Sequence, residues 1–464
     1  MAIIRPKTNI LTAGKTRRTI LKGAAGLAAV TASTGPFIRR ARARDPLVFL
    51  FWPFGSEIVL GNVEAFNAAY NEDVDARVIT GDYPAVVETQ LASNAHVDMF
   101  YTGRGQASRW YAAGWIRPID DLPGFDQIEA EMQKGVADDS RAPDGKFMAL
   151  TYYNGGPCCL YRNEKLLAEG GYGGTTNPAD YPQTWEEVAE ICRDLKKRGI
   201  SEEPLLMNWN NAWGGIPWNL FSHCYSEGEY LVDDGLNATF DENSMFVKVM
   251  TDWKQWWDEG LVPRGILTMQ EGPMNDAWVS GKHAFHPFQD YQVFSYGDKS
   301  GAVGPYNNMN PVMPGATQDT VLVGHAFVAI RNRERSEEDL LRVWKLAQFF
   351  GYKNHEGAYH THKKWVMKAN LQVPFESIYE DPEAKAAVMK WMHPELGELQ
   401  YQWQNEGRAR AMSCNMLKAA WFEEWMLPMH DIISNDLLLK GDVTPKEVAR
   451  KLRKLWDKLQ SKYT

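Results

Sequence analysis

The sequence of 464 residues has only five cysteines, and two of them, Cys158 and Cys159, are adjacent. An odd number in this arrangement does not form the even framework of a small disulfide-stapled domain. No run of about 20 apolar residues, the length that a membrane-spanning helix needs, occurs in the chain. Common enzyme signatures are also missing: there is no GxSxG nucleophile elbow, no P-loop and no HExxH zinc motif. We therefore expect a globular protein that uses no cofactor and is not an enzyme.

The first 43 residues have the parts of an export signal. Residues 16–22 hold the pair Arg17 and Arg18, followed by two apolar residues and a lysine, and a short Ala- and Gly-rich stretch follows at 23–33. Ala41-Arg42-Ala43 supplies the small–x–small cleavage pattern of a signal peptide. An ordinary basic N-terminus would not combine these features in this order. We expect export by the twin-arginine route, cleavage near Ala43 and a mature protein in the periplasm.

Loss of the signal would leave a strongly acidic chain. The sequence carries 50 Lys and Arg against 59 Asp and Glu, and nine of the basic residues lie in residues 1–43. Subtracting nine from 50 leaves 41 basic residues, and 41 against 59 gives the mature chain a formal net charge of −18. Nucleic acids and anionic membranes attract basic surfaces, so neither is an expected partner. The length of the mature chain predicts two domains.

Alternating strand-like and helical segments predict an α/β fold. Residues 46–52 and 97–101 have the apolar character and length of strands, and residues 57–70 have helical spacing. Residues 184–187 form a capping box that opens a helix to about residue 197, and residues 321–330 are a long apolar strand. Such alternation is typical of mainly parallel sheets flanked by helices.

Tryptophan is unusually frequent, with 18 residues. Indole faces stack on sugar rings because both bury apolar C–H surface. Six of these tryptophans stand at helical spacing and are expected in the core: Trp253, Trp256, Trp257, Trp278, Trp344 and Trp456. Four others follow strands or stand in loops, where ligands bind in open α/β sheets: Trp52, Trp209, Trp213 and Trp218. Asn210, between two of them, can both donate and accept, which suits vicinal hydroxyls, although Asn and Gly are also common in plain turns.

Acid–base and metal chemistry cannot be located from spacing alone. A pair of carboxylates for glycoside hydrolysis is defined by distance in space, so a periplasmic carbohydrate-active enzyme stays an alternative. His283 and His286 lie in an apparent strand, where they would face opposite sides, so we expect no shared metal ion.

Several segments together resemble the extracellular solute-binding proteins of the carbohydrate ABC-importer class, which include maltose- and glycerol-phosphate-binding proteins. The matching segments occur in the order of that family and cover nearly all of residues 46–464: residues 97–100, 112–120, 144–150, 160–167, 182–187, 313–315 and 323–330. The resemblance implies two α/β lobes, each with a mainly parallel sheet flanked by helices and joined by hinge crossovers. The first lobe would hold residues 44–151 and 305–365, and the second residues 152–304 and 366–464.

The resemblance also implies where a ligand would bind. From the first lobe the expected contacts are Trp52, Glu57, Tyr101, Arg104 and Tyr153. From the second lobe they are Asn210, Trp213, Asp290 and Tyr291, and Trp209 joins this list because it follows a strand. Gly324 and His325 stand where the family often has two glycines. The implied function is capture of a small solute, a sugar or polyol, by a monomer that delivers it to inner-membrane ABC permease subunits. A non-sugar or anionic solute, such as a glycerol-phosphate compound, is the alternative within this class.

Overall fold

The computed structural model describes residues 45–173, 177–210, 215–310 and 312–464. The predicted export signal and Trp213 lie outside the described residues. Pro46–Thr464 form one compact unit. Within the described ranges, no helix combines the length and the apolar character needed to cross a membrane. The five cysteines all lie in these ranges, where each is buried and forms no disulfide.

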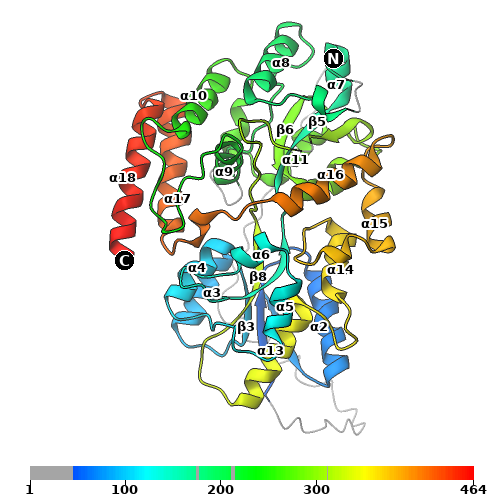
Figure 1. The fold of residues 1–464 in the computed structure, drawn as a ribbon, viewed down its shortest axis with the longest axis vertical. Helices are drawn as coiled ribbons and strands as arrows, with labels where there is room; N and C mark the ends of the chain where they lie inside the picture. The colour runs from blue at the N-terminus through cyan, green and yellow to red at the C-terminus, as the bar shows by residue number, and fades with distance from the viewer. Residues whose placement is uncertain (1–44, 174–176, 211–214, 311) are drawn as a thin grey trace, which may run out of the picture. The chain divides into compact units, whose positions relative to one another are not determined.

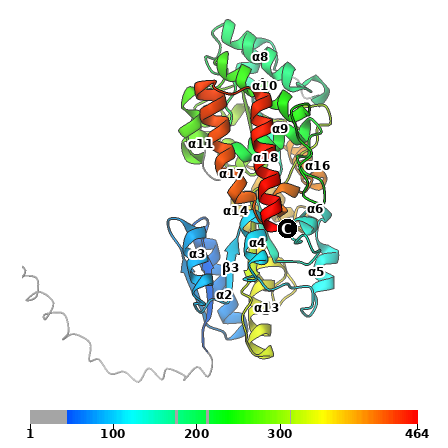
Figure 2. The same ribbon diagram turned by 90° about the vertical axis from the view of Figure 1, so that its left-hand side faces the viewer.

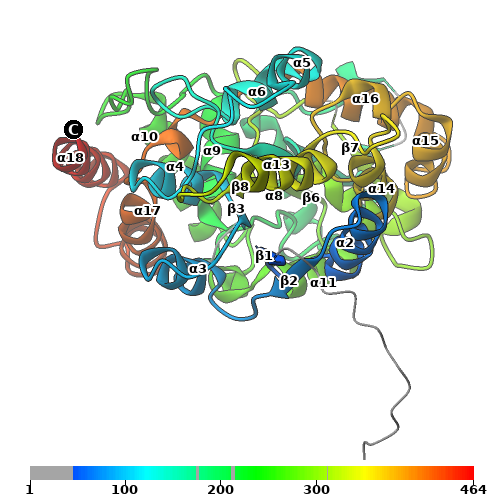
Figure 3. The ribbon, with the colours of Figure 1, turned by 90° about the horizontal axis from the view of Figure 1, so that it is seen from below.

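A five-stranded sheet forms the core of the first lobe (Figures 1 and 3). Its strands, in spatial order, are β2 (Val74–Val78), β1 (Leu47–Phe51), β3 (Met99–Thr102), β8 (His325–Ile330) and β4 (Leu150–Asn154). β1 runs parallel to both β2 and β3, whereas β8 is antiparallel to β3 and to β4. The central strands are buried along their whole length because helices cover the sheet, which agrees with their continuous apolar sequences.

The helices of the first lobe follow the strands as the alternation predicts. They are α2 (Ser56–Tyr70), α3 (Tyr83–Ala92), α4 (Arg104–Ala112), α5 (Phe125–Glu131), α6 (Lys134–Asp139), α13 (Glu337–Gly351) and α14 (His360–Ala369). α13 packs on β8 and β4, and α2 packs on β2 and on α14. The carboxyl ends of β1 and β3 lead directly into α2 and α4, so the residues after these strands are brought to one edge of the sheet.

A three-stranded sheet forms the core of the second lobe, with β5 (Cys158–Asn163) between β6 (Phe285–Gln289) and β7 (Asn307–Met309). Both pairs are antiparallel. The two-lobed α/β fold is therefore confirmed, but the expectation of a mainly parallel sheet is wrong for this lobe. Hydrophobic patterning reports which residues are buried, not the direction of a strand, and β7 is reached only after a long excursion of the chain.

Helices surround this second sheet and extend to the C-terminus. Around the sheet lie α7 (Glu164–Gly170), α8 (Trp185–Lys197), α9 (Ile216–Ser226), α10 (Met245–Asp258), α11 (Glu271–Val279) and α12 (Val293–Tyr296). The C-terminal part adds α15 (Pro382–Met389), α16 (Gly397–Arg410), α17 (Phe422–Asp431), the π-helix η7 (Ile432–Lys440) and α18 (Pro445–Tyr463). α17 and α18 pack against each other, and α18 also packs on α10 (Figure 2). The capping box predicted at Thr184 is present at the start of α8.

The chain passes between the two sheets at the junction of β4 and β5. Gly156 in this junction has φ 82°, and a Cβ atom there would lie 2.0 Å from Oδ1 of Asp290, so only glycine fits. The return passage lies between β7 and β8. Because β7 pairs with β5, this passage begins after Met309, a few residues later than the predicted boundary at 305. The segment boundaries as a whole stay a prediction.

Candidate functional site

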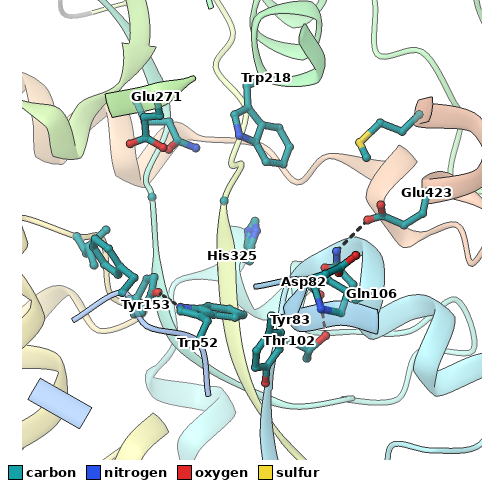
Figure 4. Close-up of a pocket in the computed structure, with 18 of the residues that line it drawn as sticks. Trp52, Asp82, Tyr83, Thr102, Gln106, Tyr153, Trp218, Glu271, His325 and Glu423 are labelled. Carbon is teal, nitrogen blue, oxygen red and sulfur yellow. Dashed lines mark hydrogen bonds between the residues drawn. The ribbon is translucent and has the colours of Figure 1, made fainter. Parts of the chain in front are cut away.

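A cavity of about 630 Å³ collects side chains from both lobes (Figure 4). Its first-lobe lining comes from the ends of β1, β3, β4 and β8, from the start of α3 and from α4. Its second-lobe lining comes from α9, α11 and the end of β6. α17 closes a third side. The lining residues are Trp52, Phe54, Gly81, Asp82, Tyr83, Pro84, Thr102, Gly103, Gln106, Trp110, Tyr153, Gly155, Trp218, Glu271, Gln289, Tyr291, Gly324, His325, Leu371, Glu423 and Met426.

Trp52 forms a fixed aromatic wall of the cavity. Its Nε1 donates a hydrogen bond of 2.9 Å to the hydroxyl of Tyr153. Its ring centroid lies 4.9 Å from that of Tyr101 and 5.4 Å from that of Tyr83. The Tyr83 hydroxyl in turn donates to the backbone carbonyl of Tyr101 over 2.8 Å. The indole is therefore held before any ligand arrives, which lowers the entropy cost of stacking on it.

The second lobe presents a second indole and an oriented carboxylate. Trp218 of α9 faces the cavity across from Trp52 in the view of Figure 4. Glu271, at the first turn of α11, accepts hydrogen bonds from the Tyr291 hydroxyl at 2.5 Å and from Nε2 of Gln292 at 2.9 Å. Two aromatic faces and a carboxylate acceptor are groups that bind the faces and the hydroxyls of a polyhydroxylated molecule.

Gln289 and Gly324 meet at the back of the cavity. The Gln289 side chain is 5% exposed, and its Nε2 has no hydrogen-bond partner among the described residues. Gly324 has φ 78°, and a Cβ atom there would lie 2.8 Å from this Nε2. The amide therefore has a donor available at the cavity, in a place that a larger residue at 324 would obstruct.

His325 lies buried beside a carboxylate. Its Nε2 is 2.6 Å from Oδ2 of Asp139, the last residue of α6. Burial lowers the pKa of His325 to about 3, with the nearby Arg104 charge adding to the effect. Burial also raises the pKa of Asp139 to about 7, against the opposing attraction of Arg104. Both shifts favour the neutral forms, so His325 carries no charge at neutral pH.

The predicted ligand contacts divide into three groups. Six line the cavity: Trp52, Tyr153, Trp218, Tyr291, Gly324 and His325. Six described residues do not line it: Glu57, Tyr101, Arg104, Trp209, Asn210 and Asp290. Trp213 lies outside the described residues. Contact with a ligand stays a prediction for the six that line the cavity.

Arg104 and Asp290 are engaged elsewhere. Arg104 donates to the Ser108 hydroxyl and to the Arg141 carbonyl, each over 2.7 Å, and is 1% exposed. Asp290 accepts a hydrogen bond of 2.7 Å from Nε of Arg408, and both side chains are buried. Both were expected ligand contacts by their position in the chain, but their charged groups are used inside the fold and not at the cavity.

The other four residues do not line the cavity, for simpler reasons. Glu57 is exposed on α2, and Tyr101 lies beneath Trp52 instead of at the cavity surface. Trp209 is fully buried against Trp253, with ring centroids 4.8 Å apart. Asn210 is buried and donates to the Asn208 side chain over 2.7 Å.

One cluster among the described residues has ligand atoms close enough for a metal ion: His223, Glu227 and Asp252. The ammonium group of Lys248 already lies 3.0 Å from the Glu227 carboxylate and 2.8 Å from that of Asp252. Nδ1 of His223 accepts from Nε1 of Trp253 over 3.0 Å, so in the neutral ring the other nitrogen carries the proton. That nitrogen cannot bind a metal in this form, and the cluster is a salt-bridge network.

A large part of this chain matches the model of one protein family. Residues 57–351 match the model of the bacterial extracellular solute-binding proteins. The chain belongs to this family. The matched range includes most of the cavity lining, from the first helix of the first lobe to α13.

Individual relatives of this solute-binding protein are distant. It is 25% identical over 184 residues to an sn-glycerol-3-phosphate-binding periplasmic protein, UgpB, of Agrobacterium fabrum, a match that covers 37% of this chain and 41% of the relative. Maltose-bound MalE3 of T. maritima is 15% identical, with a TM-score of 0.71 over 89% of this chain and 99% of that one. A ribitol-bound solute-binding protein of Agrobacterium radiobacter is also 15% identical, with a TM-score of 0.68 over 89% and 98% of the two chains. These structural likenesses show the fold.

Several lining residues of this solute-binding protein were missed in the sequence. Asp82 and Tyr83 follow β2 directly and open α3, so the rule that ligands lie beyond strand ends could have identified them. Gln106 and Glu271 stand within helical patterns that indicate packing. Glu423 belongs to a C-terminal helix that no local signal connects to the first lobe, yet it accepts a hydrogen bond of 3.1 Å from Gln106.

Proposed function

We propose that this protein binds a sugar or polyol in the periplasm and delivers it to an ABC importer of the inner membrane. The cavity carries this proposal: indole faces from both lobes line a space in which carboxylate, amide, hydroxyl and imidazole groups converge. Aromatic faces bury the apolar side of a sugar ring, and the polar groups exchange hydrogen bonds with its hydroxyls. A volume of about 630 Å³ is in the range of small-molecule sites.

Binding would work by closure of the two lobes. A ligand that touches Trp52 in one lobe and Trp218 in the other gains its full set of contacts only when the lobes approach each other. It therefore shifts the population towards the closed form by the free energy of the contacts present only there. We propose that the closed form is the one that the permease subunits recognise, that the protein acts as a monomer, and that the twin-arginine signal exports it.

The relatives support a solute with several hydroxyl groups, but the ligands in their names differ in charge. The names of the distant relatives mention maltose, ribitol and sn-glycerol 3-phosphate. The chain spans about 41% of the length of the glycerol-phosphate-binding relative, so that ligand does not transfer by similarity. The cavity favours the uncharged sugars and polyols over the phosphate ester, because no Lys or Arg is among its described lining residues.

Thermal-shift screening of the mature protein against sugars, polyols and glycerol phosphates tests the proposal. A ligand present at 100 times its Kd stabilises the folded state by about 2.7 kcal/mol, which raises Tm measurably. Mass spectrometry of the incubated ligand distinguishes binding from turnover: we expect it to be recovered unchanged. Stabilisation by none of the sugars and polyols would contradict the proposed substrate class, and a hydrolysed product would favour the carbohydrate-active enzyme.

A further inference from the structure

Among the described residues that line the cavity, the charged side chains are all acidic. Asp82 lies at the start of α3, Glu271 at the start of α11 and Glu423 at the start of α17. None of the three forms an ion pair with a basic residue in the described part of the chain. His325 also lines the cavity, but burial lowers its pKa to about 3, so it carries no charge at pH 7. The cavity therefore gathers carboxylates from three separate elements without a counter-charge.

The surroundings of Glu423 show that its nearest cation is used elsewhere. Arg109 of α4 lies near enough to influence Glu423, but its guanidinium forms an ion pair with Glu88 at 3.0 Å. Glu88 also accepts a hydrogen bond of 2.9 Å from Nε1 of Trp110. Burial consequently raises the pKa of Glu423 to about 7, with Glu88 adding repulsion and Arg109 only partly opposing it. The uncharged amide of Gln106 is the hydrogen-bond donor that Glu423 has.

Glu271 and Asp82 are also oriented by uncharged donors. The Tyr291 hydroxyl and the Gln292 amide hold Glu271, and the backbone N–H of Ala85 donates to Asp82 over 3.2 Å. Lobe closure around a neutral ligand would remove water from these carboxylates and supply no positive charge. Burying an unpaired charge is costly, whereas burying it against an opposite charge with good hydrogen bonds recovers much of that cost.

The rest of the cavity suits a ligand with both a cation and hydroxyl groups. Trp52 and Trp218 present faces whose quadrupole attracts a cation within about 6 Å of the ring centre. Gln289 is 95% buried, and its Nε2, which has no partner among the described residues, needs an acceptor such as a hydroxyl oxygen. This buried donor is independent of the acidic side chains and indicates that a ligand at the same place offers it an acceptor oxygen.

We infer that the solute carries a protonated amine beside its hydroxyl groups, as an amino sugar or amino polyol does. This inference rests on the proposed function and narrows its substrate class. It also predicts that phosphate and carboxylate derivatives are rejected, in contrast to the distant relatives that bind glycerol phosphate. Their anionic group would approach the carboxylates of Asp82 and Glu271, and no Lys or Arg among the described lining residues would attract it.

Matched sets of compounds test this inference by isothermal titration calorimetry. One set is 1-amino-1-deoxysorbitol, sorbitol and gluconate, which share a carbon skeleton and differ in charge. A second set is the disaccharide of glucosamine and its N,N′-diacetyl counterpart. In the set that binds, we expect the amine to bind at least about tenfold more tightly than the neutral member, the scale of one hydrogen bond to a charged group. We expect the anion to bind more weakly than both.

Single variants test whether these carboxylates cause the preference for the amine. Glu271→Gln and Glu423→Gln keep the size of the side chain and remove its charge. Each should therefore lower, by about tenfold, the ratio of the Kd of the neutral compound to the Kd of the amine. Glu424→Gln is the matched control for Glu423, because Glu424 bonds Lys462 and Tyr463 away from the cavity. Asp276→Asn, on the exposed side of α11, is the control for Glu271. Both controls should keep the wild-type ratio.

The other possible outcomes also test the inference or the proposed function. Equal or tighter binding of a neutral or anionic member would overturn the amine inference and leave sugar or polyol binding intact. A wild-type preference for the amine that survives both pocket variants would show that these carboxylates do not cause it, and would overturn the inference as well. Binding of no member of either set, nor of any sugar or polyol in the thermal-shift screen, would contradict the proposed function itself.

Discussion

Replacement of Trp52 by alanine is the most informative single change in the cavity. A sugar ring stacked on this indole buries about 80 Å² of apolar surface, which at about 25 cal/mol per Å² contributes about 2 kcal/mol. Loss of that face should weaken binding about thirtyfold. Trp52→Ala also removes the hydrogen bond to Tyr153 and the contacts with Tyr83 and Tyr101, so we expect a lower Tm as well.

Titration calorimetry with the solute identified by thermal shift measures this effect, and a control variant separates it from general destabilisation. Trp115 is another half-buried tryptophan of the first lobe, but it does not line the cavity. Trp115→Ala should therefore lower Tm without changing Kd. If Trp52→Ala lowers Tm and leaves Kd within about twofold of the wild type, a difference of about 0.4 kcal/mol, then Trp52 is not the platform and the reasoning fails.

Three further predictions concern stability and export. Asp290→Ala removes the carboxylate that pairs with Arg408 and leaves the Arg408 charge buried without an opposite charge. The free energy of unfolding, measured in urea, should fall by about 3–5 kcal/mol. An unchanged value would show that the pair is not buried in solution. The pKa of Asp139 is raised in the folded state, so the folded protein holds this proton more tightly than the unfolded chain does. The free energy of unfolding should therefore fall as the pH rises from about 4 to about 7, and Asp139→Asn should make this fall shallower. An identical pH profile in the variant would contradict the raised pKa. Replacement of both Arg17 and Arg18 by lysine should leave the protein in the cytoplasm in a fractionation assay, and normal export would exclude the twin-arginine route.

The sequence predicted the fold well where local patterns decide it. The apolar run of β1 and the helical spacing of α2 are sufficient to place these elements, and the capping box at Thr184 fixes the start of α8. Strand direction in the second lobe depends on which distant segments pair, as β7 with β5, and no local pattern contains that information.

The candidate site was predictable only in part, for a related reason. Trp52 follows β1 at a strand end, where both physical reasoning and the family pattern expect a ligand contact. Arg104 and Asp290 stand at family positions, but their partners, Arg141 and Arg408, come from other parts of the chain and turn the charges inward. Glu423 reaches the cavity from a helix more than 300 residues beyond Gln106 along the chain, so its position could only come from the tertiary structure.

We propose that each chain binds one solute molecule in the cavity between the two lobes. Calorimetric titration of a variant that lacks both indoles, Trp52→Ala with Trp218→Ala, tests this most directly, with Trp115→Ala as the folded control. We predict that the wild type and the control bind one molecule of the solute per chain and that the double variant, still folded by circular dichroism, binds none at the same concentrations. Wild-type affinity in the double variant would place the solute elsewhere and contradict the account.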